Sequence, residues 1–239
     1  MKKVICFDFD DTLFDYAATE RVALKFVFDE LDIPFNNLYI GMFKDINRKI
    51  WNESERDRRL DKNLLRFERF KILFQKLEIN NPDELAKEAS MIYIKKSEKG
   101  ILIDGVETTI KYLNQKGYTL LIASSGLSNP RLQKLQDSPI KNCFYKSLFR
   151  ENFKEEDIKP RRGFFDQIAY LSKLERKDML FVGNNFYDDI KGAKEAGFAT
   201  VWFNYFNIPE REVDTETYCD YIIYNFEDLI NKVEDWDNA

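Results

Sequence analysis

The sequence contains no histidine among its 239 residues and only three cysteines. Without histidine, neither a Ser-His-Asp nor a Cys-His nucleophile system can operate, and an HExxH zinc site is excluded. Acid–base chemistry must therefore come from carboxylates, lysine, tyrosine or cysteine. Cys6, Cys143 and Cys219 lie far apart and form no CxxC pair, so we expect neither a disulfide framework nor a zinc ribbon.

Long apolar runs and an excess of positive charge are also missing. Only four apolar residues separate Lys3 from Asp8, which is too few for a signal peptide. No stretch approaches the ~18 apolar residues of a membrane span, and the formal net charge of -5 argues against a nucleic-acid-binding surface. We therefore expect a soluble, cytoplasmic protein with neither a membrane nor a nucleic-acid polymer as partner. The sequence alone predicts no oligomeric state.

What the sequence does contain is an alternation of short apolar runs with helix-like stretches. The runs at residues 4–9, 118–123, 179–182, 199–203 and 221–223 are typical of buried strands. Helical stretches lie between them, among them residues 106–116, 163–174 and 188–196, and an acidic helix is expected over 225–239. This alternation predicts an α/β fold with a Rossmann-like parallel sheet covered on both faces.

One region breaks the alternation. Residues 16–98 contain no convincing strand, and Pro34 and Pro82 divide them into what we expect to be four helices. One amphipathic stripe is formed by Leu64, Phe67, Phe70, Leu73, Phe74 and Leu77. We therefore expect an α/β core domain of residues 1–15 and 99–239, interrupted by a helical domain of residues 16–98.

Three acidic residues crowd the carboxyl end of the first predicted strand: Asp8, Asp10 and Asp11. Open α/β sheets bind ligands at that end, and residues two apart in a strand share a face, so Asp8 and Asp10 can reach one site. Two carboxylates held that close repel each other unless a cation lies between them or one is protonated. An oxygen-only cluster of this kind suits Mg²⁺. Helix capping explains one aspartate, but hardly three beside a buried strand.

Two more segments carry polar residues that could bind an anion. Ser124, Ser125 and Gly126 follow the strand at 118–123, where hydroxyl and backbone N–H groups can form an anion site. A turn in which Ser128 or Asn129 caps the next helix explains the same residues equally well. Lys159 precedes a proline among other surface cations. Only its position in the chain distinguishes it, because it lies between the serine segment at 124–126 and the acidic loop at 183–189.

A fourth segment is the acidic loop after the strand at 179–182. It carries Asn184, Asn185, Asp188 and Asp189 directly after Gly183. If neighbouring strands bring this loop beside Asp8, it can supply the remaining metal ligands. The alternative is a plain loop in which Asp188 caps the following helix.

These four segments, in this order, resemble the signature of the haloacid dehalogenase (HAD) superfamily. Asp8, Asp10 and Thr12 match its DxDx[TV] motif, while residues 183–189 match its GDxxxD-type acidic loop. Ser124 matches the hydroxyl residue after the second strand, and Lys159 matches the family's lysine. The helical insert resembles the family's small cap. The cap sequence and the carboxyl-terminal segments AGFATVWFN and YIIYNFEDL resemble noncanonical pyrimidine 5′-nucleotidases and the related N-acylneuraminate-9-phosphatases.

The resemblance implies a Mg²⁺-dependent phosphatase that acts on a small phosphorylated metabolite. Asp8 is then the nucleophile that forms an aspartyl-phosphate, and Asp10 is the general acid and base. The resemblance also implies phosphate binding by Ser124, Ser125 and Lys159. The implied metal ligands are Asp8, Asp10, Asn184 and Asp189.

Two departures from the family pattern leave alternatives open. Asn184 stands where the acidic loop has its first aspartate, and Ser124-Ser125 replaces the Thr-Asn of many nucleotidases. The substrate can be a nucleoside 5′-monophosphate or a sugar phosphate resembling N-acylneuraminate 9-phosphate. A dehalogenase and a HAD-fold binding module with little turnover are the two other hypotheses.

Residues of the helical insert are the candidates for substrate recognition. Its aromatic residues include Tyr39, Phe43, Trp51, Phe67 and Phe70, which can either stack on a base or form the core of the insert. Arg58 and Arg59 can meet a second anionic group of the substrate or lie solvated on the surface.

Overall fold

The computed structural model describes residues 3–56, 61–173 and 175–238. Arg58 and Arg59 lie outside these ranges. The chain divides into two compact units, which we call the sheet unit (residues 1–16 and 100–239) and the helical unit (residues 17–99). Each unit has its own hydrophobic core.

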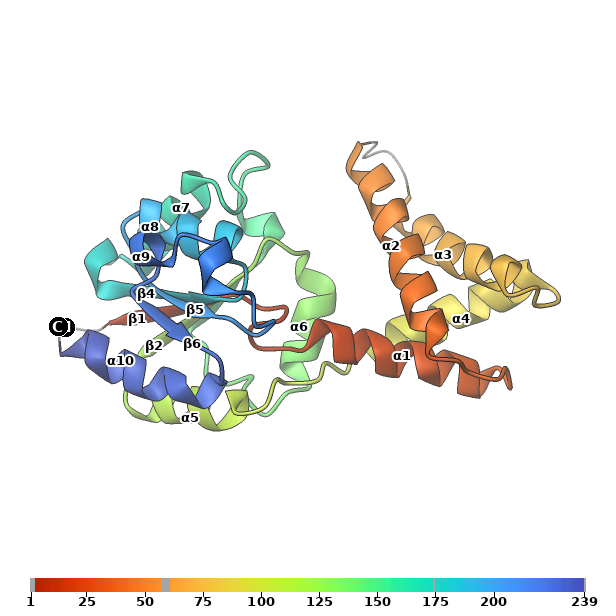
Figure 1. Ribbon diagram of the computed structural model, residues 1–239, viewed down its shortest axis with the longest axis horizontal. Coiled ribbons are helices and arrows are strands. Elements are labelled where there is room, and N and C mark those ends of the chain that lie inside the picture. Colours follow the sequence, from red (N-terminus) through yellow and green to blue (C-terminus); the bar gives the residue numbers. More distant parts are fainter. Residues whose placement is uncertain (1–2, 57–60, 174, 239) are drawn as a thin grey trace. The chain divides into compact units, whose positions relative to one another are not determined.

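The sheet unit is built on six parallel strands in the order β3-β2-β1-β4-β5-β6 (Figure 1). The strands are β1 (Val4–Phe7), β2 (Thr119–Ala123), β3 (Lys146–Leu148), β4 (Met179–Gly183), β5 (Ala199–Phe203) and β6 (Tyr221–Ile223). The first strand ends at Phe7 rather than at Phe9. The edge strand β3 was not predicted, because it has three residues and only Leu148 among them is buried.

Helices cover both faces of the sheet, as the apolar strands require. Ile5 and Phe7 of β1 point to a core shared with α5 (Val106–Gln115) and α10 (Leu229–Asp237). Val4 and Cys6 point to the other face, against α7 (Arg162–Ser172) and α8 (Gly192–Glu195). Figure 1 shows these two helical layers on opposite sides of the strands. The alternation along β1 follows the two-residue period of a strand.

Several helical segments of the sheet unit are short. They include α6 (Ser128–Gln136), α9 (Thr215–Tyr218), and the 3-10 turns η1 (Arg150–Asn152), η2 (Arg176–Asp178), η4 (Glu210–Glu212) and η5 (Phe226–Asp228). The helix predicted over 188–196 is instead a π-helical turn, η3 (Phe186–Lys191), followed by α8. Asp188 does not cap it. The cap is Asn185, whose side chain accepts hydrogen bonds from the backbone N–H groups of Tyr187 and Asp188, each at 3.0 Å.

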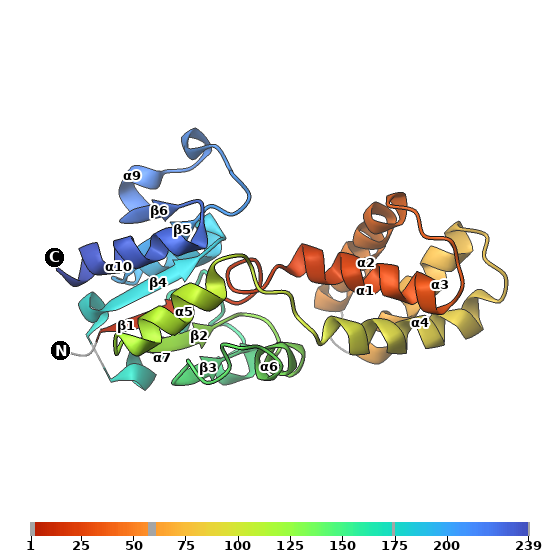
Figure 2. The same cartoon turned by 90° about the horizontal axis from the view of Figure 1, so that it is seen from below.

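The helical unit contains α1 (Tyr16–Glu30), α2 (Leu38–Arg56), α3 (Lys62–Lys76) and α4 (Pro82–Ser97), which Figure 2 shows grouped together. Phe43 and Phe70 are fully buried in its core, with ring centroids 5.0 Å apart. The hypothesis that these two rings stack on a substrate base is therefore wrong. Tyr39, Trp51 and Phe67 are half-buried against the same core. Leu64 is exposed, and Leu65 takes its place in the core stripe.

The chain leaves and re-enters the sheet unit at neighbouring points. Asp15 N donates a hydrogen bond to Ile101 O at 2.8 Å, and Phe14 forms an antiparallel bridge with Leu102. The insert therefore begins and ends beside one short backbone pairing. Within the described ranges, none of the helices combines the length and the apolar character that crossing a membrane demands.

Candidate active site

Three adjacent strand ends carry the predicted site residues. β1 lies between β2 and β4 in the sheet, so the residues that follow these strands emerge side by side. Asp8 follows β1, and its backbone N–H donates to Val182 O of β4 at 2.9 Å. Ser124 follows β2, and its N–H donates to Leu148 O of β3, also at 2.9 Å. These backbone hydrogen bonds to neighbouring strands thus fix the positions of the Asp8 and Ser124 backbones.

Lys159 joins the segments after β1 and β4. Its Nζ lies 2.6 Å from Asp8 Oδ1 and 2.6 Å from Asp189 Oδ1. All three side chains are buried, with exposed fractions of 6% for Lys159, 11% for Asp8 and 1% for Asp189. Two carboxylates therefore face a single ammonium group in a place that water barely reaches.

The pKa values reflect this crowding. Burial raises the pKa of Asp8 to about 6; Lys159 lowers it, and the charges of Asp189 and Asp10 raise it further. Burial disfavours the charged form of Lys159, but the Asp189 and Asp8 carboxylates outweigh it and hold the pKa of Lys159 above its ordinary value. Lys159 therefore stays a cation, and Asp8 takes up a proton more readily than an exposed aspartate does.

Asp189 is held tightly from its own loop. Its Oδ2 accepts a hydrogen bond from Asn185 N at 3.0 Å. A Cβ atom on Gly183 would lie 2.4 Å from Asp189 Oδ2 and 2.5 Å from Asp189 Cβ, so only glycine leaves room for the carboxylate at the end of β4. The glycine thus explains how this aspartate packs back against the strand that precedes it.

The two serines after β2 have different surroundings. Ser124 is buried, and its Oγ accepts a hydrogen bond from Gly126 N at 3.3 Å, which leaves its proton available for donation. Ser125 Oγ accepts from Lys159 N at 3.2 Å and so fixes the backbone that carries the lysine. Neither Ser128 nor Asn129 caps the next helix. Glu151 does so instead, because its carboxylate accepts from Ser128 N at 3.0 Å.

Asn184 lies against the segment after β1. Its Oδ1 accepts a hydrogen bond from Thr12 Oγ1 at 3.2 Å, and its backbone oxygen accepts from Trp202 Nε1 at 3.0 Å. The amide oxygen has a second lone pair that could serve as a ligand. The structure therefore brings the first and the fourth segments together at this residue as well as at Lys159.

The remaining two aspartates of the first segment differ from Asp8. Asp11 adopts a φ of 57°, and its Oδ1 accepts from Tyr16 N, the first residue of α1, at 3.0 Å. Helix capping thus accounts for Asp11 alone. Asp10 Oδ2 forms an ion pair with Arg131 Nη2, and its Oδ1 lies 3.8 Å from Lys134 Nζ.

Arg131 and Lys134 of α6 are site residues that the sequence reasoning missed. Their sequence gives one indication. Arg131 and Lys134 are three residues apart in the helix that follows the loop of Ser124 and Ser125, and this spacing places both side chains on one face of the helix. Surface helices carry many such pairs, so the spacing has meaning only once the fold is known.

The donor set fits a magnesium ion held by two carboxylates. In the described ranges no three Asp, Glu or Cys side chains are grouped so that they could hold a metal together. Mg²⁺ is usually held by one or two carboxylates, with water and substrate phosphate completing its octahedron. Asp8 and Asp189 are such a pair, and one ammonium group does not neutralise both. The buried negative charge left over is what a divalent cation would balance.

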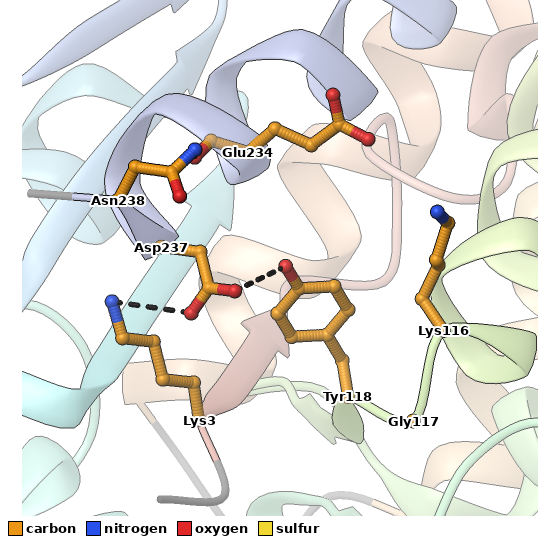
Figure 3. Close-up of a pocket in the computed structure, with 7 residues that line it drawn as sticks. All are labelled: Lys3, Lys116, Gly117, Tyr118, Glu234, Asp237 and Asn238. Atoms are coloured by element: carbon orange, nitrogen blue, oxygen red, sulfur yellow. Dashed lines mark hydrogen bonds and ion pairs between the residues drawn. The ribbon is translucent and has the colours of Figure 1, made fainter.

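A cavity of about 670 Å³ lies elsewhere on the sheet unit (Figure 3). Lys3 and Tyr118 line it, and both precede their strands, so it lies at the edge opposite Asp8 and Ser124. Asp237 pairs with both, at 3.3 Å from Lys3 Nζ and 3.0 Å from Tyr118 Oη. This cavity is therefore separate from the candidate active site, and its Lys3, Tyr118 and Asp237 side chains already pair with one another.

Comparisons with known proteins agree with this geometry. Residues 2–197 match the family model of the haloacid dehalogenase-like hydrolases. Pyrimidine 5′-nucleotidase PynA of Streptococcus pneumoniae is 24% identical, over 96% of this chain and 94% of its own. Glyceraldehyde 3-phosphate phosphatase of Pyrococcus furiosus is 26% identical, over 97% and 93%.

Bacillus subtilis YfnB, which is named as a HAD-hydrolase, is 27% identical over 84% of both chains. Its crystal structure, described as bound to magnesium, superposes with a TM-score of 0.74 at 26% identity and covers 97% of this chain and 98% of its own. The predicted α/β fold is thereby confirmed. The chain belongs to the haloacid dehalogenase-like hydrolase family.

Proposed function

We propose that this hydrolase is a Mg²⁺-dependent phosphatase of small phosphomonoesters, with Asp8 as its nucleophile. The observation that carries the proposal is the position of Lys159 Nζ, 2.6 Å from the buried carboxylates of both Asp8 and Asp189. A phosphate dianion that approaches Asp8 meets negative charge. The lysine, and a divalent cation held by the two aspartates, would offset that repulsion.

The proposed reaction proceeds in two steps. Asp8 attacks phosphorus and forms an aspartyl-phosphate while the bond to the leaving oxygen breaks and Asp10 gives that oxygen its proton. Asp10 then takes a proton from water, whose oxygen bonds to phosphorus and releases inorganic phosphate and the Asp8 carboxylate. Ser124 donates a hydrogen bond to a phosphoryl oxygen, and Ser125 fixes the backbone of Lys159.

Magnesium, when bound, supplies charge neutralisation and orients the phosphoryl group. Asp8, Asp189 and the backbone oxygen of Asp10 would hold it, and Asn184 would contribute its amide oxygen. The support for these ligands is that the Asp8 and Asp189 carboxylates share one ammonium group, which leaves negative charge for a cation to balance.

We propose a nucleoside 5′-monophosphate as the substrate. The support is the likeness to PynA, which spans nearly the whole of both chains. The likeness to glyceraldehyde 3-phosphate phosphatases favours a sugar or triose phosphate as the second candidate, the class to which an N-acylneuraminate 9-phosphate also belongs. In both cases the substrate is a small phosphorylated metabolite.

Two other activities have less support. A halide leaves without a proton, so a dehalogenase needs no acid beside its nucleophile, whereas here Asp10 follows Asp8 by two positions and Asp189 shares Lys159 with Asp8. A binding module without turnover is favoured only by Asn184, and its amide still faces Thr12 in the same site.

A screen of phosphomonoesters tests the proposal. Nucleoside 5′-monophosphates, sugar phosphates, p-nitrophenyl phosphate and a 2-haloacid would be assayed with Mg²⁺ and with a chelator, and Asp8→Asn would serve as the control protein. We expect Mg²⁺-dependent phosphate release that the variant lacks. Halide release, or no turnover of any phosphate ester, would overturn the proposal.

A further inference from the structure

Asp10 has its own set of cations, distinct from the lysine that pairs with Asp8. Arg131 Nη2 forms an ion pair with Asp10 Oδ2, and Lys134 Nζ lies 3.8 Å from Asp10 Oδ1. Both cations belong to α6, which follows the serine loop. The two aspartates of the first segment are therefore held from different parts of the chain and can be perturbed separately.

Arg131 is fixed in place by contacts beyond its charge. Its Nη1 donates to Leu127 O at 3.1 Å, so the planar guanidinium is held by one nitrogen while the other reaches Asp10. A Cβ atom on Gly126 would lie 1.8 Å from Arg131 Cζ, so the missing side chain makes room for the guanidinium. The arginine and Asp10 side chains are only 19% and 21% exposed.

The two carboxylate oxygens of Asp10 consequently differ. Oδ2 is bound by Arg131, whereas Oδ1 is buried, makes no hydrogen bond to the described residues and has Lys134 Nζ at 3.8 Å. A buried carboxylate oxygen without a partner is costly unless something else uses it. The contact with Arg131 therefore fixes how the carboxyl group of Asp10 is oriented.

We propose that Arg131 is a positioning residue for Asp10, which anchors Oδ2 and so orients the carboxyl group for proton exchange with the leaving oxygen. The inference rests on the proposed function, in which Asp10 is the general acid. As the phosphorus–oxygen bond breaks, the proton moves from the Asp10 carboxyl group to the leaving alkoxide, and Arg131 stabilises the carboxylate that forms. In the second step water returns a proton to Asp10.

This role ties Arg131 to the leaving group and not to the phosphate. A p-nitrophenolate departs readily without a proton, whereas an alkoxide needs one. Loss of the anchor should therefore impair alkyl phosphates selectively. The quantity to compare is kcat/KM, because it reports the first step, in which the leaving group departs; the later hydrolysis is common to all substrates.

The experiment measures kcat/KM for p-nitrophenyl phosphate and for the alkyl phosphate that the wild type hydrolyses fastest. We expect Arg131→Met to lower the alkyl value by about 10- to 100-fold, a part of the usual contribution of general acid catalysis. The aryl value should fall by far less. Arg131→Lys should recover part of the loss, because it keeps a cation but cannot bind Leu127 and Asp10 together.

Two controls separate the possible results. Arg176→Met breaks an ion pair with Asp166, whose N···O distance is 2.6 Å, and should change neither value. Asp10→Asn should show the same selectivity as Arg131→Met, only stronger. If Asp10→Asn impairs both substrates equally, the proposed function fails, because Asp10 is then not the acid.

If Asp10→Asn is selective and Arg131→Met is not, the inference about Arg131 alone is overturned. It is also overturned if Arg131→Met raises KM equally for both substrates at unchanged kcat, since the arginine would then bind the phosphate itself. A folding defect would lower both values together, which also contradicts the selective loss expected.

Discussion

Lys159 and Asp8 are 151 positions apart in the chain, and Lys159 Nζ lies 2.6 Å from Asp8 Oδ1. The same nitrogen lies 2.6 Å from Asp189 Oδ1, so one cation joins the segments that follow β1 and β4. Because the lysine cannot neutralise both carboxylates, the site keeps a negative charge that depends on pH and on bound metal.

Asp8→Asn should abolish phosphatase activity and leave the fold intact. The amide has nearly the same shape but cannot attack phosphorus, so we expect a loss of at least about 10³-fold. The measurement is Mg²⁺-dependent release of p-nitrophenolate from p-nitrophenyl phosphate. Asp188→Asn is the matched control in the acidic loop. Turnover above a few per cent in Asp8→Asn would show that another residue is the nucleophile.

The same variant should change how the stability of the metal-free protein depends on pH. The pKa of Asp8 is raised from 3.8 to about 6, so the folded state binds the proton more tightly than the unfolded state does. This residue therefore destabilises the wild type progressively as pH rises through that window. We expect Asp8→Asn to have a higher Tm than wild type at pH 8 and a smaller difference at pH 4.

Thermal unfolding in a chelator at both pH values measures this effect. For a chain of this length, each kcal/mol shifts Tm by about 2–4 °C. A difference between the two proteins that stays constant from pH 4 to pH 8 would mean that Asp8 keeps an ordinary pKa.

Asp189→Ala should weaken the response to Mg²⁺ far more than Asp188→Ala does. Asp189 is buried and shares the lysine with Asp8, whereas Asp188 is half-buried and bonds Asn185 Nδ2 at 3.1 Å. We expect the Mg²⁺ concentration for half-maximal rate to rise by about tenfold or more in Asp189→Ala, which corresponds to about 1.4 kcal/mol. Equal shifts in both variants would refute this assignment of the metal ligand.

Asn184→Asp should lower the Mg²⁺ requirement, by about threefold or more, because a charged oxygen attracts the cation more strongly than an amide oxygen does. The carboxylate can still accept the hydrogen bond from Thr12, so the local structure should persist. A magnesium titration of both proteins is the measurement, with Asn185→Asp as a control in the same loop. An unchanged requirement would place residue 184 outside the coordination sphere.

Part of this site could be predicted from the sequence, because the ends of buried strands can be predicted from their apolar runs. Asp8, Ser124 and Asp189 each follow an apolar run, and a parallel sheet aligns the carboxyl ends of its strands. Lys159 lies in no strand or helix, and its role depends on a loop path that local sequence does not determine. Its identification needed the family resemblance.

Other features could not be predicted because they depend on contacts between segments that are distant in the sequence. Arg131 and Lys134 read as ordinary helix surface until α6 is placed beside Asp10. The sequence allows Asp188 as the cap because both residue types cap helices, but the π-helical turn begins at Phe186 and makes Asn185 the cap. The short edge strand β3 owes its existence to pairing with β2 and not to its own composition.

The hydrogen bond between Asp15 and Ile101 marks where the insert departs and returns. Since the chain resumes its course at the point where it left, the spacing of β1, β2 and β4 does not depend on how many residues lie between those two positions. Mutation can therefore lengthen, shorten or exchange the inserted helices while Asp8 and Lys159 stay in register. A scaffold arranged in this way allows the inserted helices and the site at the strand ends to evolve at different rates.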